Sequence, residues 1–272
     1  MAINFHEKYA SKIAEAFTHA SFVKGVFTAK LDFTGAKTVK VTKLVTVEEV
    51  DYTRSGLNRY GTPEDVQDTV TEYTMTQDKA FTGVVDEGDA KDQALENKAG
   101  AWLKAQLEEV SVPNADKYAF AQMAAKGTTL SLGAAPNEET VVEMFAKARA
   151  NMTNAVVPVK GRVAFVPATT YSYIMLAPQF INLEKLGTPA VGNGHVGNLM
   201  GFRVIEVPDD HMPSGVHAIF VHEKAGCMPY KIAKTKIHKD PPGVGGSLIE
   251  GRHYYDFFVF DEKKAAVQVA KN

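Results

Sequence analysis

Few residues of this 272-residue sequence have the types and spacing that catalysis requires. The segment 192–197 matches G-x-G-x-x-G, the glycine pattern of dinucleotide sites. Such a site needs a strand before the motif and a helix after it, so that the pyrophosphate meets the helix N-terminus. Here Thr188 and Pro189 precede the motif and a strand-like segment follows it. We interpret 187–201 as a flexible surface loop, and an enzyme that uses nucleotides there stays an alternative.

A second set of side chains carries atoms that bind metal ions. Its members lie around two strand-like segments: Asp209, Asp210, His211, His217 and His222. Protein metal sites need a defined ligand set at regular separations. The spacing here fits no such set, and the acidic pair lies in a turn flanked by proline. We therefore expect no metal site in this stretch.

Three smaller motifs also lack the partners that catalysis needs. Ser21 and Lys24 match S-x-x-K, but no partner motif follows and the context is a helix end. Glu108 and Glu109 are adjacent on a predicted helix, so their carboxylates diverge and cannot flank a substrate. Cys227 is the single cysteine, which forms no internal disulfide and reads as a passive residue at a strand start. We predict no catalytic, cofactor-binding or metal-binding residue, and no enzyme.

The only basic cluster lies on one predicted strand. It consists of Lys231, Lys234, Lys236, His238 and Lys239. The net charge of the chain is −2, which excludes a protein that binds nucleic acid through its overall charge. The cluster is either a solvated face, a weak contact to phosphate backbones or a charged seam between subunits.

Composition indicates a soluble globular chain, with 45% hydrophobic and 23% charged residues. Its length allows one large domain or two small ones. No segment reaches the ~18 consecutive apolar residues of a membrane span. His6, Glu7 and Lys8 interrupt any signal-peptide core, so we expect the protein to be made in the cytoplasm and to stay there unless an assembly carries it out.

Periodicity predicts helices in the first half of the chain. Segment 3–24 has apolar residues at helical spacing, and it packs on its own domain or reaches a neighbouring subunit. The strongest pattern runs over 90–112, with Trp102 as the expected core anchor and Pro113 as the stop. Asn114 caps a second helix over 115–126.

From residue 128 the pattern becomes mixed helix and strand. Helices are predicted over 137–152 and 169–180. Strands are predicted over 161–166, 202–207, 216–222, 230–238, 254–260 and 265–269.

The stretch 31–86 is the most unusual part of the sequence. Two β-branched runs, 38–47 and 69–76, flank a centre rich in glycine and proline, which predicts a long hairpin with arms of about 12–15 residues. Its apolar residues are scattered, and a lone two-stranded ribbon is marginal in water. The hairpin is therefore either the edge of an ordinary sheet or a ribbon that lies on another copy of the chain.

The order of these parts resembles the major capsid proteins of tailed bacteriophages, the Hong Kong 97 type fold that encapsulin shells share. The resemblance implies an α+β fold with an N-terminal arm (1–30), an extended hairpin loop (31–86), a peripheral domain with a spine helix (87–127 and 229–272) and an axial domain (128–228). No short diagnostic motif carries it. Lys37, Lys40 and Lys43 lie on the first arm, but nothing marks one of them as reactive, and we predict no crosslink.

What the resemblance implies for function is an icosahedral head that encloses double-stranded DNA. The chain would assemble with itself into hexamers and pentamers, with a scaffolding protein, a portal and in some cases a decoration protein as further partners. Contact with DNA would be weak and non-specific, no membrane would be involved, and the protein would be a virion component assembled in the host cytoplasm. An encapsulin-like compartment around a protein cargo is the first alternative.

Overall fold

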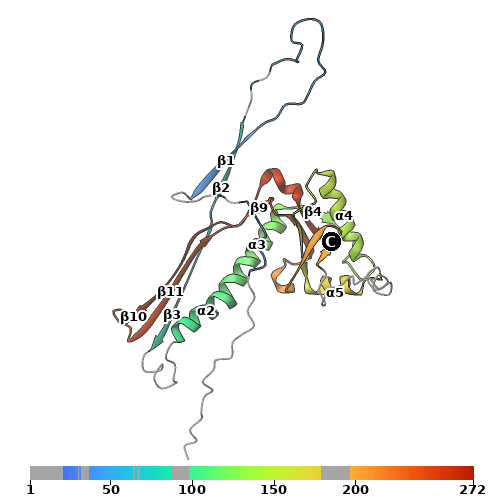
Figure 1. The fold of residues 1–272 in the computed structure, drawn as a ribbon. Coiled ribbons are helices and arrows are strands. Elements are labelled where there is room, and N and C mark those ends of the chain that lie inside the picture. Colours follow the sequence, from blue (N-terminus) through green and yellow to red (C-terminus); the bar gives the residue numbers. More distant parts are fainter. Residues whose placement is uncertain are drawn as a thin grey trace, which may run out of the picture.

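A computed structural model describes residues 21–29, 31, 37–63, 65, 68–86, 98–178 and 197–272. Three parts are visible in Figure 1: a body built on a six-stranded sheet, a long three-stranded sheet beside a helix, and a hairpin that projects away from both. The mixture of helix and sheet confirms the α+β class.

The six-stranded sheet has the order β4-β13-β8-β5-β7-β6. Its strands are β4 (Thr128–Ser131), β5 (Arg162–Pro167), β6 (Asn198–Leu199), β7 (Phe202–Val207), β8 (Val216–His222) and β13 (Val267–Lys271). β5 pairs in parallel with β7, and β13 with β4, whereas the other neighbours are antiparallel. Every residue of β5 is buried, as expected for a central strand that is covered on both faces.

Alternation along β5 divides the core into two layers. Val163 and Phe165 face the helix α3 (Val112–Lys126), where Phe120 meets Phe165 edge-on at 5.1 Å between ring centroids. Ala164 and Val166 belong to the opposite layer, with the helices α4 (Val141–Asn154) and α5 (Ala168–Leu176). Phe145, Phe202 and Phe220 pack together in that second layer.

One helical segment runs without a break through α2 (Lys98–Ala105), the π-helical turn η1 (Gln106–Ser111) and α3. The prediction that Pro113 ends the first helix was wrong. In the wider π turn the Val112 N–H donates to the Leu107 carbonyl, and Pro113 falls in the first turn of α3, where no N–H is needed. The helix predicted over 115–126 is therefore the continuation of the first one; residues 90–97 lie outside the described residues.

The long sheet has the order β10-β11-β3 and is antiparallel throughout, with β3 at Gln77–Asp86, β10 at Tyr230–Lys239 and β11 at Gly246–Tyr255. Trp102 connects α2 to this sheet. Its ring packs edge-on against Phe81, and a Cβ at Gly83 would meet the indole at 2.5 Å, so only glycine fits there without movement. Trp102 is half-buried, so it is a link between helix and sheet and not the core anchor that we expected.

Two predicted strands differ from the observed ones. The run 254–260 is split, because β11 ends at Tyr255 and β12 (Phe258–Val259) pairs instead with β9 (Gly226–Cys227). The final strand, predicted over 265–269, lies two residues later at Val267–Lys271 and belongs to the six-stranded sheet. Its partners are β4 and β8, which are distant in sequence, so its alternation alone could not assign it to a sheet.

Candidate assembly surfaces

The hairpin pairs β1 (Thr38–Leu44) with β2 (Asp68–Thr74) in antiparallel register, with Thr38 opposite Thr74 and Leu44 opposite Asp68. Each arm has seven residues, so the predicted arms of about 12–15 residues were too long. The rest of the second β-type run turns at Met75 and continues as β3 in the long sheet. The described residues between the arms, 45–63 and 65, form neither helix nor strand.

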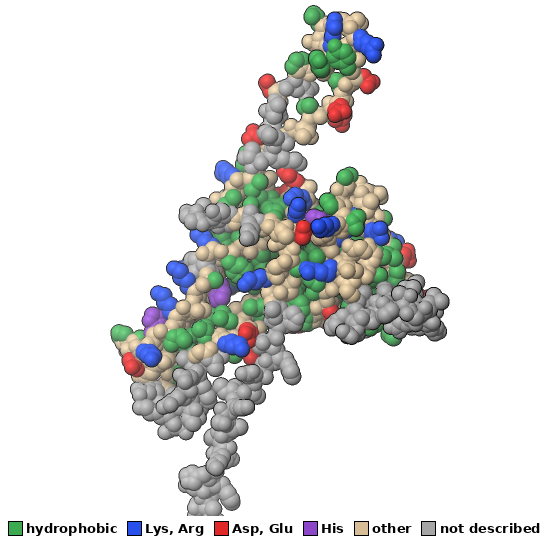
Figure 2. All heavy atoms as spheres, in the orientation of Figure 1, with side chains coloured by type: hydrophobic (Ala, Val, Ile, Leu, Met, Phe, Trp, Pro, Cys, Tyr) green, Lys and Arg blue, Asp and Glu red, His purple; other side chains and the backbone are tan. Residues whose placement is uncertain are grey.

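The far end of the hairpin loop exposes apolar side chains. Leu57 is 96% exposed and Tyr60 87% exposed. Figure 2 shows hydrophobic and basic side chains gathered there, well away from the body. The end is held by its own contacts, since the Thr53 N–H donates to the Arg59 carbonyl at 3.1 Å and the rings of Tyr52 and Tyr60 meet at 5.0 Å. Exposed apolar side chains in one place indicate a surface that another protein covers.

The root of the hairpin is buried in the body. Tyr73 and Met75 are enclosed by a small apolar cluster that also contains Leu31, Val39, Val41, Tyr254, Phe258 and Phe260. The hairpin is therefore held by buried contacts at its root, whereas its far end projects away from the body.

Asp256 fixes the turn between hairpin and body. Its buried carboxylate accepts hydrogen bonds from the Thr76 N–H at 2.7 Å and the Thr76 hydroxyl at 2.9 Å. It also accepts from the Tyr118 hydroxyl at 2.8 Å and the Phe257 N–H at 2.7 Å. One carboxylate thus joins the turn between β2 and β3, the end of β11 and α3, which is part of the continuous helical segment 98–126, here called the spine helix. We missed Asp256, although a single acidic residue within the aromatic run 254–258 signals a buried group that needs donors.

Asp116, on α3, anchors the start of the described chain, as Asp256 anchors the turn after the hairpin. Its buried carboxylate accepts from the Ser21 hydroxyl and, at 2.8 Å, from the Phe22 N–H. Burial raises the pKa of the Asp116 carboxyl, and the hydrogen bonds from Ser21 and Phe22 and the charge of His211 act in the opposite direction. Residues 21–24, predicted as a helix end, form a turn; residues 3–20 of that predicted helix lie outside the described residues.

The raised pKa of Asp116 predicts a pH-dependent stability. Ionising a group whose folded pKa lies above its unfolded pKa costs folding free energy, so its contribution is full below the unfolded pKa and is lost as pH rises through the folded pKa. We expect the free energy of unfolding of the wild type, measured in urea, to fall relative to Asp116→Asn as pH rises from the ordinary carboxyl pKa through the raised one. A difference that is constant with pH, or that changes in the opposite direction, would contradict this.

The metal-capable residues are dispersed over separate contacts. Asp209 accepts from the Thr169 N–H at 3.0 Å, and Asp210 pairs with Lys117 at 2.7 Å. His211 lies edge-on to Phe22, and the His222 Nε2 lies 2.9 Å from the Lys160 carbonyl oxygen. Within the described part of the chain, no three His, Cys, Asp or Glu side chains converge on one point.

The other flagged residues have structural contacts. Ser21 is bonded to Asp116, and its oxygen accepts from the Lys24 N–H at 2.9 Å. Cys227 is buried in β9, and burial raises the pKa of its thiol to about 12. Glu108 and Glu109 lie in the π turn. Of the segment 192–197, only Gly197 belongs to the described residues.

The basic cluster lies along β10 and has acidic neighbours on β11 and β3. His238 is 3.2 Å from Glu250, and Lys234 and Lys236 share a shallow hollow with Glu250 and Arg252. The Arg252 guanidinium holds Asp78 through two bonds of 2.9 and 2.6 Å and lowers the pKa of that carboxyl. This face is of mixed charge, which favours a solvated face or a subunit seam over a phosphate site.

Comparison with known proteins decides the fold. No protein-family model and no curated protein matches the sequence. Solved structures match almost the whole chain: one from Mycobacterium phage Che8 at 21% identity, TM-score 0.81, covering 99% of this chain and 98% of that one. The mature capsid of bacteriophage PhiM1 matches at 13% identity, TM-score 0.74, covering 99% and 92%. The capsid structure of the cyanophage P-SCSP1u matches at 11% identity, TM-score 0.79, covering 98% and 92%.

The chain has the fold of phage capsid proteins. That confirms the predicted resemblance in fold. The boundaries of the predicted arm, loop and two domains stay predictions. No helix among the described residues is long and apolar enough to span a bilayer.

Proposed function

We propose that this chain is the major capsid protein of a tailed bacteriophage, which self-assembles into hexamers and pentamers of an icosahedral head around double-stranded DNA. The proposal rests mainly on the structure of the hairpin: its root is buried, and its far end exposes apolar side chains. A single chain gives that end no surface to cover, whereas a shell brings a neighbour to every copy. The phage-capsid fold over nearly the full length supports the same conclusion.

The physical mechanism is the repeated burial of modest contacts. Each copy extends its hairpin onto a neighbour, and the conformational entropy that ordering the loop costs is offset only on assembly. The net charge of −2 suits confinement of DNA without tight binding. In this proposal the protein is a structural virion component and not an enzyme, assembles in the host cytoplasm, and meets a scaffolding protein, a portal and in some cases a decoration protein.

Electron microscopy of the purified full chain in negative stain tests the proposal. We expect closed shells or rings of capsomer size, and nucleic acid inside shells taken from infected cells. Monodisperse single chains under all assembly conditions would contradict it. Shells that contain a protein cargo and no nucleic acid would instead favour an encapsulin-like compartment, which uses the same fold.

A further inference from the structure

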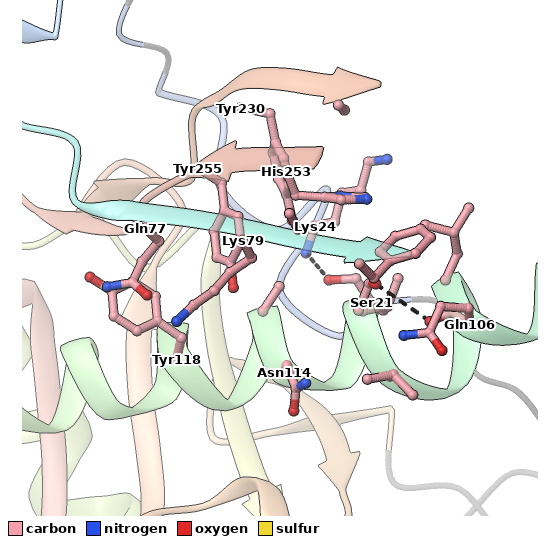
Figure 3. Close-up of a pocket in the computed structure, with 18 residues that line it drawn as sticks. Ser21, Lys24, Gln77, Lys79, Gln106, Asn114, Tyr118, Tyr230, His253 and Tyr255 are labelled. Atoms are coloured by element: carbon pink, nitrogen blue, oxygen red, sulfur yellow. Dashed lines mark hydrogen bonds between the residues drawn. The ribbon is translucent and has the colours of Figure 1, made fainter. Parts of the chain in front are cut away.

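A groove of about 740 Å³ separates the spine helix from the long sheet (Figure 3). Figure 3 shows His253 and Tyr255 on the sheet side of the groove and Tyr118 on the helix side. The groove has two charged side chains, Lys24 and Lys79, and none of the described residues that line it is Asp or Glu. A further positive charge inside the groove would therefore find no counter-charge there.

His253, on β11, presents one ring nitrogen to this groove. Its Nε2 atom is buried and has no hydrogen-bond partner among the described residues, whereas Nδ1 is not enclosed in this way. A neutral imidazole has one N–H, and with that hydrogen on Nδ1 only a lone pair is buried. Protonation would add an N–H at Nε2, and a buried donor without an acceptor costs stability. Burial accordingly lowers the pKa of His253.

The groups that face His253 offer no negative charge to an imidazolium. Its direct neighbours across the long sheet are Lys79 on β3 and Ala233 on β10. The other titratable groups of the groove come from the segment 21–24, α3, β10 and β11: Lys24, Tyr118, Tyr230 and Tyr255. Burial raises the pKa of each of the three tyrosines, so their hydroxyls stay neutral.

The carboxylates of the surrounding elements are directed elsewhere. Asp78 and Glu250 lie on the opposite face of the long sheet, where each contacts a basic side chain. Asp116 and Asp256 already accept the hydrogen bonds that hold Ser21 and Thr76. The acidic residues of the π turn also do not line the groove: Glu108 and Glu109.

Three rings in series connect His253 to the spine helix. The imidazole lies 5.8 Å from the ring of Phe81, with an angle of 33° between the two planes. Phe81 in turn meets Trp102 of α2 edge-on, at 6.1 Å between ring centroids. A Cβ at Gly251 would collide with the Phe81 ring, so that ring lies close against the sheet. Movement of the imidazole out of the groove would therefore remove one side of the support for the contact between Phe81 and Trp102.

We propose that His253 is an acid-sensitive latch between the long sheet and the spine helix. While the imidazole is neutral, it stays in the groove and the three rings hold the sheet against the helix. When the imidazole is protonated, it turns to solvent and the contact between Phe81 and Trp102 loosens. The latch is a property of one chain and does not depend on shell formation.

The direction of the pH dependence follows from the lowered pKa of His253. In the pH range between its folded pKa and its unfolded pKa, which is about 6.5, the unfolded chain binds more protons than the folded chain. The free energy of unfolding is therefore highest above the unfolded pKa and falls as pH drops through that value toward the folded pKa.

Quenching of Trp102 fluorescence by acrylamide tests the latch in the full chain. Trp102 is the only tryptophan of the sequence and belongs to the series of rings. Between about pH 7.5 and about pH 5, the quenching constant of the wild type should rise about twofold, because the loosened contact exposes the indole. In His253→Phe, which keeps a ring beside Phe81 but takes up no proton, the constant should not change with pH.

His238→Phe is the matched control. His238 lies on β10 of the same sheet, on the face away from the groove, and its side chain is 42% exposed. This variant should show the same rise in quenching as the wild type. The latch would be overturned if the wild type and His253→Phe responded equally to pH, or if His238→Phe abolished the response and His253→Phe did not.

Urea unfolding gives a second measurement, with a second variant that takes up no proton, His253→Gln. The ratio of the unfolding equilibrium constant of the wild type to that of His253→Gln should rise at least about threefold between about pH 7.5 and about pH 5. Comparison at each pH cancels the contribution of Asp116, which both chains share. A ratio that stays constant, or that falls toward acid pH, would reject the latch.

Discussion

Replacing residues 45–67 with a two-residue Asn-Gly turn should leave a folded chain that no longer closes shells. The cut is made beyond β1 and β2, where Leu44 and Asp68 are direct partners, so a two-residue hairpin turn can join them. The root residues Tyr73 and Met75 and the bonds to Asp256 are retained. A larger deletion of 36–78 would remove these root contacts as well and would confuse loss of assembly with loss of folding.

The expected result is a separation of assembly from stability. Thermal unfolding should change by only a few degrees, as expected for a shift within about 1 kcal/mol. Sedimentation and electron microscopy should show single chains or capsomers in place of shells. Leu57→Ser with Tyr60→Ser should weaken assembly in the same direction, whereas Val159→Ser, an exposed apolar residue of the body, should not. Normal shells from the shortened chain would refute the role given to the hairpin.

Asp256→Ala should be among the most destabilising single substitutions in the chain. It removes the acceptor of four hydrogen bonds at the junction of hairpin, helix and sheet, of which the bond from the Phe257 N–H is buried and the other three are part-buried. Burial raises the pKa of Tyr118, so its hydroxyl stays protonated and is one of the orphaned donors. We expect a loss of roughly 3–5 kcal/mol in the free energy of unfolding, since a hydrogen bond to a charged group contributes about 1.5–3 kcal/mol and the buried Phe257 N–H would lose its acceptor.

Urea unfolding with matched variants checks this figure. Tyr118→Phe removes one of the four bonds and should cost about 1 kcal/mol. Asp78→Ala removes an exposed carboxylate that pairs with Arg252, and its effect should be much smaller, because exposed ion pairs contribute little. If Asp256→Ala cost no more than Asp78→Ala, the junction would not depend on the buried carboxylate.

Local patterns predicted most elements of the body, but not how they connect. The alternation at 216–222 and the apolar run at 161–166 gave β8 and β5 nearly residue for residue. The helix over 98–126 was predicted in two pieces, because the usual effect of Pro113 is a break and the π turn that accommodates it has no sequence signal. The order of the strands in each sheet depends on pairing between residues that are distant in sequence, which local patterns do not predict.

The candidate assembly surfaces also combine features that local patterns predict with features that depend on long-range contacts. β-Branched residues at 38–44 and 69–74 predicted the paired arms, since their alternation is local. The bend at Met75 and Thr76 could not be predicted, because it is fixed by Asp256, which lies 180 residues away. Likewise, the apolar groove between the spine helix and the long sheet is lined by residues that are far apart in the sequence, so no single stretch predicts it.

The position of β13 has a consequence for synthesis on the ribosome. This strand lies between β4 and β8, so the six-stranded sheet stays divided until residues 267–271 have emerged. Until then β4 and β8 present unpaired strand edges, which attract other chains. The hairpin emerges roughly 200 residues earlier than β13 and waits throughout that interval with little apolar surface along its arms. Translation therefore sets the order of events: the hairpin is synthesised first, and the sheet of the body to which it is attached is completed only when β13 has emerged.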